Sequence, residues 1–157
     1  MKNPLKILSL KNNGITEQAA LHISMLAKSG IINLDISENP LGPNFYLNLP
    51  SWRGSTINIL DVSSTNMNSE ALIYFFNRLE ENKAIQHLKM DRNNFSNNWF
   101  GQIKEAFEVN TSIETLSMVD CSIKRMSEAF AGLYHNRYLR KFNISGSQFE
   151  EGVKELC

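Results

Sequence analysis

One short apolar line occurs six times in this chain and constrains its fold more than any other feature. Each copy reads apolar-x-x-apolar-x-apolar-x-x followed by Asn or another small residue. The second apolar positions are Leu8, Leu34, Leu60, Leu88, Leu116 and Phe142, so successive copies are 26, 26, 28, 28 and 26 residues apart. A unit of this length cannot bury its own apolar face, and neighbouring units must therefore stack and share one elongated core.

The spacing of apolar residues changes within each repeat. The line itself alternates like a strand, whereas the stretch from Leu72 to Leu79 follows the 3.6-residue period of a helix. Two further stretches share this helical spacing: Met126, Ala129, Phe130 and Leu133, and Trp99, Ile103 and Phe107. Hydroxyl residues that precede helical stretches are expected to cap them: Thr16, Ser69, Ser96 and Ser127. Each unit therefore predicts a strand, a turn and a helix.

The second repeat departs from this plan after Leu41. Pro43 suits the first turn of a helix, but Pro50 lacks an amide and predicts that the helix ends by about Leu49. Trp52 is expected to fold back and fill the space of the missing turns. In the alternative interpretation, Trp52 and Arg53 form an exposed anchor for a partner.

The line and its period resemble the ribonuclease-inhibitor-like class of leucine-rich repeats, whose pattern is LxxLxLxxNxL followed by an α-helix. The resemblance implies an α/β fold, a curved solenoid with a parallel sheet on the concave face and helices on the convex face. It implies one domain over 1–157 with about six repeats, starting near 5, 31, 57, 85, 113 and 139. The last repeat is incomplete, so we expect a segment of a larger array whose uncapped ends leave self-association open.

The last position of each line is expected to join neighbouring repeats through hydrogen bonds. A buried side-chain amide there satisfies main-chain groups that would cost about 1–3 kcal/mol each if left unpaired. Asn13, Asn39 and Asn93 keep the amide, whereas the shorter side chains are expected to make weaker rungs of this ladder: Thr65, Cys121 and Ser147.

The sequence contains no set of residues that predicts catalysis or metal binding. The three histidines, His22, His87 and His135, lie in different repeats, and Cys121 and Cys157 belong to no metal-ligand motif. We therefore expect a protein that is not an enzyme and needs no cofactor. Cys121 is expected to be a buried, inert thiol, because a reactive cysteine would need a lowered pKa.

Charge and composition restrict the classes of partner and the cellular location that we expect. Lys plus Arg number 16 and Asp plus Glu number 16, so no field of one sign favours nucleic acid or an anionic membrane. The chain shows no signal-peptide or membrane-spanning stretch, and its two cysteines are too few for a disulfide framework. A cytoplasmic location is expected.

The outward side of the strands is the candidate binding surface. Neighbouring strands lie about 4.8 Å apart, so Asp35, Asp61 and Lys89 are expected side by side, with Ser37 and Ser63 continuing the outward rows. The candidate partner-binding residues are Asp35, Ile59, Asp61, His87, Lys89, Asp91 and Arg92. The alternative is a solvated face whose charges pair locally and contribute little energy.

The sequence thus predicts a non-catalytic protein–protein interaction scaffold that binds another protein through its concave strand face. Two narrower functions remain open because the repeat class also occurs in them. One is a GTPase-activating protein of the Ran type, for which Arg92 beside Asn93 is the nearest candidate pair. The other is a regulator of the actin cytoskeleton of the tropomodulin or CARMIL kind.

Overall fold

A computed structural model describes residues 4–80, 82–95, 100–124 and 132–147. Its strands are β1 (Ile7–Ser9), β2 (Asn33–Asp35), β3 (Ile59–Asp61), β4 (His87–Lys89), β5 (Thr115–Ser117) and β6 (Lys141–Asn143). Its helices are η1 (Glu17–Ala19, a 3-10 turn), α1 (Ala20–Leu26), α2 (Gly42–Leu47), α3 (Ser69–Leu79) and α4 (Phe100–Val109). Residues 132–135 are also helical.

The six strands of the described residues form one parallel sheet in the order β1-β2-β3-β4-β5-β6. The register joins the second apolar residue of each line to the same position of the next, as in Leu34 with Leu60 and Leu60 with Leu88. The prediction that the lines are adjacent parallel strands is therefore confirmed, as is the α/β class. Parallel neighbours need a long crossover, which the helix-containing part of each repeat supplies.

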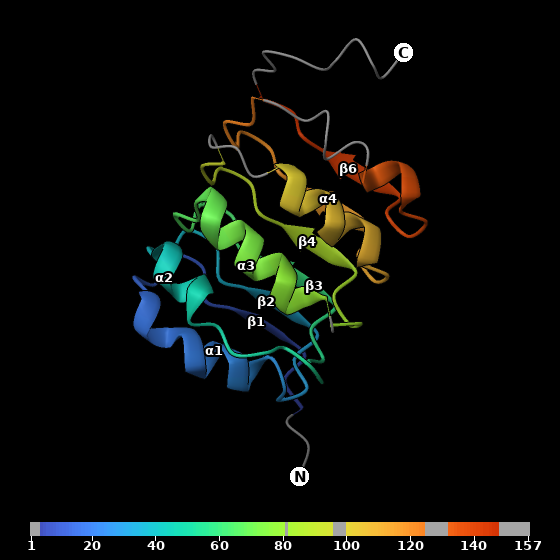
Figure 1. Ribbon diagram of the computed structural model, residues 1–157. Coiled ribbons are helices and arrows are strands. Elements are labelled where there is room, and N and C mark those ends of the chain that lie inside the picture. Colours follow the sequence, from blue (N-terminus) through green and yellow to red (C-terminus); the bar gives the residue numbers. More distant parts are fainter. Residues whose placement is uncertain (1–3, 81, 96–99, 125–131, 148–157) are drawn as a thin grey trace.

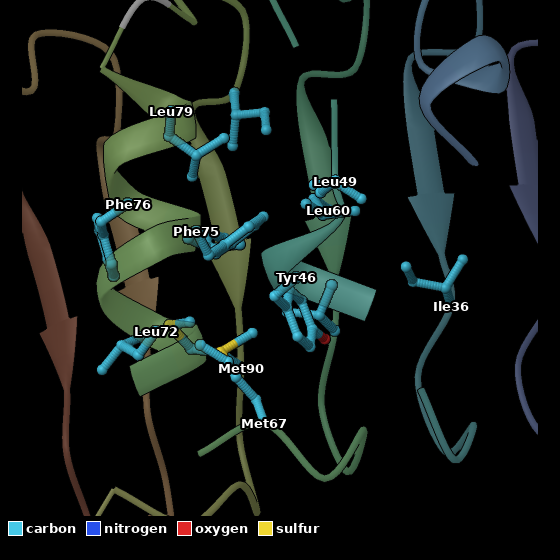
Figure 2. Close-up of a cluster of buried hydrophobic side chains, with 14 of the residues drawn as sticks. Ile36, Tyr46, Leu49, Leu60, Met67, Leu72, Phe75, Phe76, Leu79 and Met90 are labelled. Carbon is cyan, nitrogen blue, oxygen red and sulfur yellow. The ribbon is translucent and has the colours of Figure 1, made fainter. Parts of the chain in front are cut away.

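Helices α1 to α4 lie on one side of the sheet, in the same order as the strands (Figure 1). The core fills the space between the two layers, and Figure 2 shows the ring of Phe75 extending from α3 toward the side of Leu60 on β3. Phe75 contacts both Tyr46 and Trp52 edge-to-face, with ring centroids 5.4 and 6.2 Å apart. Burying one large apolar side chain stabilises the fold by about 1.5–3 kcal/mol. Because these side chains contact residues of neighbouring repeats, much of the stability comes from contacts between repeats.

The start of α3 corrects one of the capping predictions. Asn68, not Ser69, is the N-cap, and its Oδ1 accepts a hydrogen bond from the Ala71 amide at 2.9 Å. Thr16 does stand at the N-cap of η1, but its side chain accepts no capping bond. Ser69 is the first residue of the helix and is buried, because α3 begins one residue earlier than the hydroxyl pattern suggested. Ser96 and Ser127 lie outside the described residues.

The second repeat has the short helix that its prolines predicted. Helix α2 ends at Leu47, with Pro43 in its first turn. Trp52 is only 1% exposed, and its Nε1 donates a 3.3 Å hydrogen bond to Ser24 Oγ in the first repeat. The indole therefore fills the space beside α2. The alternative interpretation, in which Trp52 is an exposed anchor for a partner, is wrong. Arg53 is exposed.

The predicted ladder of side-chain amides is present at Asn39 and Asn93. Asn39 Oδ1 accepts from the amides of Asn13 and Ile15 at 2.9 and 3.0 Å, and its Nδ2 donates to the Leu10 carbonyl of the preceding repeat. Cys121 keeps a poorer version of this rung, donating through sulfur to the carbonyl of Met90 at 3.2 Å. These contacts hold the ends of neighbouring strands at one level, which places the outward side chains in rows.

No helix within the described ranges is long and apolar enough to cross a lipid bilayer.

Candidate functional site

The sheet has one face turned away from the helices, which we call the strand face. It consists of the first and third residues of each strand, and all of them are exposed or partly exposed: Ile7, Ser9, Asn33, Asp35, Ile59, Asp61, His87, Lys89, Thr115, Ser117, Lys141 and Asn143. The second residues of β2 to β5 point the other way and are at most 1% exposed. This alternation follows from the two-residue period of a strand.

The register brings the predicted charged residues of the strand face together. Asp61 pairs with Asp35 on one side and with Lys89 on the other, as predicted. In the neighbouring row, Ile59 pairs with His87. Asp91 and Arg92 follow β4 and lie at the edge of the sheet where strands turn toward helices. The structure therefore places the seven candidate residues on one face and its adjoining turn edge.

Two of the carboxylates also terminate their own strands. Asp35 Oδ1 accepts hydrogen bonds from the amide and the hydroxyl of Ser37, at 2.9 and 2.6 Å. Asp61 Oδ1 accepts from the Ser63 amide at 2.9 Å. A side chain that bonds two residues ahead stabilises a turn, so these aspartates have a structural task as well as an exposed charge.

The serines of these turns correct a further expectation. Ser37 and Ser63 were expected to continue the outward rows, yet both are only 4% exposed. Ser63 Oγ accepts a hydrogen bond from the Asp91 amide of the next repeat at 3.1 Å. The small hydroxyl side chains are thus covered by their neighbours, so in the second and third repeats the accessible part of the face ends at Asp35 and Asp61.

Lys89 breaks the pattern of its row because an ammonium group cannot accept the hydrogen bond that Asp35 and Asp61 accept. Asp91 instead supplies an acceptor to the following repeat, where its Oδ1 receives bonds from Ser117 Oγ at 2.6 Å and the Val119 amide at 2.9 Å. Lys89 is exposed, and no hydrogen bond or ion pair joins its ammonium to any described residue. It is therefore available to a partner.

His87 lies beside Lys89 on β4 and is half-buried. Its Nδ1 is 2.9 Å from Thr115 Oγ1, the residue opposite it on β5. This contact orients the imidazole along the strand face. Since the threonine hydroxyl serves as donor or acceptor, the contact is compatible with either neutral tautomer.

A row of charges follows the turn edge, and sequence reasoning identified only one member of it. Glu38 Oε1 lies 3.0 Å from Lys11 Nζ and 3.8 Å from a terminal nitrogen of Arg92. The Nε of Arg92 also donates to Ser64 Oγ at 2.9 Å. Arg92 thus bridges three repeats, because Glu38, Ser64 and Arg92 occupy the same position in theirs, directly before the ladder residue. This shared position in the repeat is the sequence feature from which the row could have been predicted.

These turn residues share an unusual backbone conformation. The position before each ladder residue has a positive φ: Asn12, Glu38, Ser64, Arg92, Asp120 and Gly146. The left-handed region costs a residue with a Cβ about 1 kcal/mol or more. Main-chain bonds to the next repeat offset this cost, as when the Arg92 amide donates to the Val119 carbonyl at 2.8 Å. The backbone therefore repeats the same conformation along the turn edge, which we also call the rim, and its side chains start from equivalent positions in successive repeats.

A shallow polar hollow of about 500 Å³ opens beside this rim. Within the described part of the chain it is lined by Asn66, Met67, Asn68, Arg92, Asn93, Asn94, Asp120 and Ser122. Asn93 contributes little accessible surface to this hollow, because the residue is 4% exposed and its side chain is hydrogen-bonded to main-chain groups.

The described residues contain no group of three or more His, Cys, Asp or Glu side chains placed to hold a metal ion. His22 is exposed on α1, His87 lies on β4 and His135 is exposed beyond α4, so the structure does not bring the histidines together. Cys121 is fully buried, and burial raises the pKa of its thiol to about 12. The prediction of a buried thiol is confirmed, and its raised pKa is opposite to what a reactive cysteine needs.

The sequence matches no protein-family model, and no curated protein matches it at a significant level.

Proposed function

We propose that this protein is a non-catalytic interaction scaffold that binds another protein through its strand face. The observation that carries the proposal is a sheet face in continuous register that no helix of the described ranges covers. At its centre lies the ammonium of Lys89, which forms no ion pair with the residues described. Strands hold their side chains more rigidly than loops do, so a partner meets a preorganised surface and less conformational entropy is lost on binding.

We also propose that the array is a curved leucine-rich-repeat solenoid of about six repeats over 1–157, with the strand face concave. Packed helices are about 8–10 Å apart whereas hydrogen-bonded strands are about 4.8 Å apart. Helices on one side and strands on the other therefore favour curvature toward the strands. A cytoplasmic location is part of this proposal and is supported by Cys121, a buried cysteine without a disulfide.

The experiment compares a photo-crosslinking side chain at two positions in extract of the cells that produce the protein. Benzoylphenylalanine replaces Ile59 on the strand face or, as the matched control, Tyr74, which is 46% exposed on α3. We expect protein adducts from position 59 and a loss of these adducts in the Asp61→Ala/Lys89→Ala double variant. Adducts only from position 74, or adducts from position 59 that the double variant leaves unchanged, would contradict the proposal.

The Ran-type and actin-regulating functions remain narrower alternatives. A GTPase turnover assay with and without this protein tests the first of them. The contacts of Arg92 with Glu38 and Ser64, and the burial of Asn93, leave that residue pair engaged within the fold and do not favour this alternative.

A further inference from the structure

The strand face has an acidic part and a basic part. Asp35 and Asp61 lie on β2 and β3, and the side-chain hydrogen bonds they accept come from neutral amide and hydroxyl groups. Such donors leave the negative charges uncompensated. The pKa of Lys11, at the turn edge, is raised mainly by its hydrogen bond to Glu38 and by the charge of Glu38. The negative charges of Asp35 and Asp61 make smaller contributions in the same direction.

The basic part extends over β4 to β6. It contains Lys89 and Lys141, both exposed, and neither forms an ion pair with any residue of the described ranges. His87 and Lys141 lie two strands apart in the row of first strand residues. Asp35, Asp61 and Lys89 lie in the row of third residues.

Two further charges lie close to the basic part. Asp91 follows β4 at the turn edge and accepts hydrogen bonds from neutral groups of the β5 repeat, so it keeps its negative charge beyond the end of the strand. Glu114 pairs with Arg140 at 3.7 Å. On the strands themselves, the charges available to a partner are negative on β2 and β3 and positive on β4 and β6. The arrangement is a dipole that runs across the strands.

The sheet geometry sets the spacing of these charges. Strands lie about 4.8 Å apart, so Asp61 and Lys89 are one step apart. Asp35 and Lys141 are four steps apart, about 19 Å across the strands, and are offset by two residues, about 7 Å, along them. An extended peptide advances about 3.3 Å per residue, so about six residues of a partner laid across the strands span this distance.

We propose that the strand face recognises an extended protein segment of complementary charge order, with basic side chains over Asp35 and Asp61 and acidic side chains over Lys89 and Lys141. The two acidic side chains would lie about three and six residues beyond the one over Asp35. This inference rests on the proposed function and specifies the chemistry of its partner. A polyanion fits the face less well, because Asp35 and Asp61 would repel it within the same surface.

The experiment uses two fluorescein-labelled synthetic peptides of the same composition. In the block peptide, two adjacent Lys residues are followed by Glu residues about three and six positions after the first Lys, which matches the strand spacing, and in the alternating peptide the charges alternate. Binding to the full chain is measured by fluorescence anisotropy at low salt, where surface charges are least screened. We expect the block peptide to bind about fivefold more tightly, the effect of a few exposed charge pairs.

Three variants test whether the preference comes from the strand face. Lys89→Glu should abolish the preference, whereas Lys89→Arg should keep it. Lys28→Glu makes the same charge change in the helix layer, after α1, and should also keep the preference. Circular dichroism of each variant verifies that the fold is retained.

Equal binding of the two peptides, or a preference that survives Lys89→Glu, overturns the inference. Tighter binding of heparin than of the block peptide also overturns it, since a polyanion would then be the better match. If strand-face crosslinks persist while the peptides bind equally, only the charge order is wrong. If the crosslinks at position 59 are absent as well, the scaffold function is wrong too.

Discussion

The side-chain oxygen of Asn93 accepts a 3.1 Å hydrogen bond from the main-chain amide of Thr65, one repeat earlier. The same oxygen accepts from the Met67 amide, and the side-chain nitrogen donates to the carbonyls of Val62 and Met90 at 3.0 Å. One buried amide thus satisfies main-chain groups in two repeats. The contact joins the ends of β3 and β4, the strands that carry Asp61 and Lys89.

We expect Asn93→Ala to lower the free energy of unfolding by about 2–4 kcal/mol, because several buried main-chain groups lose their partners. Urea unfolding followed by circular dichroism measures the change. Asn13→Ala is the matched control, since Asn13 is exposed and its Nδ2 donates to the Lys11 carbonyl alone among the described residues. A loss in the control as large as that at Asn93 would contradict the ladder as the cause.

Trp52 replaces the missing turns of the second helix, so its removal should leave a large cavity. We expect Trp52→Ala to cost about 3–5 kcal/mol of unfolding free energy, in the range of aromatic deletions in cores. Arg53→Ala, next to it but exposed, should change the stability by less than about 0.5 kcal/mol. Chemical unfolding monitored by circular dichroism compares the two variants, and equal effects would refute the buried role of Trp52.

Burial of ionisable groups predicts a loss of stability at alkaline pH. The pKa of Cys121 is raised to about 12 from an ordinary value of 9.0. Well below pH 9 both the folded and the unfolded thiol are neutral, so the thiol does not change the stability there. As the pH rises toward 12, the unfolded state loses the proton first and the folded state is destabilised.

Cys121→Ala should therefore flatten this alkaline decline, although the variant is less stable at pH 7. Tyr46 contributes in the same direction, because burial raises the pKa of its phenol while its hydrogen bond to Thr65 opposes the shift. Urea midpoints at pH 7, 9 and 11 provide the measurement. An identical pH dependence in the parent protein and the Cys121→Ala variant would show that the thiol does not titrate as described.

Lys89 and Asp61 should differ in their importance for folding although they are neighbours in register. Asp61→Ala removes the acceptor for the Ser63 amide and should cost about 1 kcal/mol. Lys89→Ala removes no described contact and should change the unfolding free energy by less than about 0.5 kcal/mol. Thermal and urea unfolding test this difference, and a strongly destabilised Lys89→Ala variant would mean that binding defects at this position arise from folding.

Much of the fold and part of the site were predictable from local pattern. The lines that contain Leu34, Leu60 and Leu88 predicted adjacent parallel strands, and their register predicted the neighbours of Asp61. Pro50 predicted the short second helix. These features depend on periodicity and on the missing amide of proline, which act within a few residues of chain and repeat at a nearly constant interval.

Other features were decided by the tertiary structure. The local path of the turn decides that Asn68 and not Ser69 is the cap. The burial of Ser37 and Ser63 depends on how neighbouring repeats pack. The contacts of Arg92 depend on which atoms of different repeats come within about 3–4 Å, as with Ser64 at 2.9 Å and Glu38 at 3.8 Å. Hydrogen bonds and ion pairs weaken steeply with distance and angle. A one-dimensional pattern states which residues share a row, but only the packed repeats determine which of their charges are bonded inside the protein and which, like Lys89, remain available to a partner.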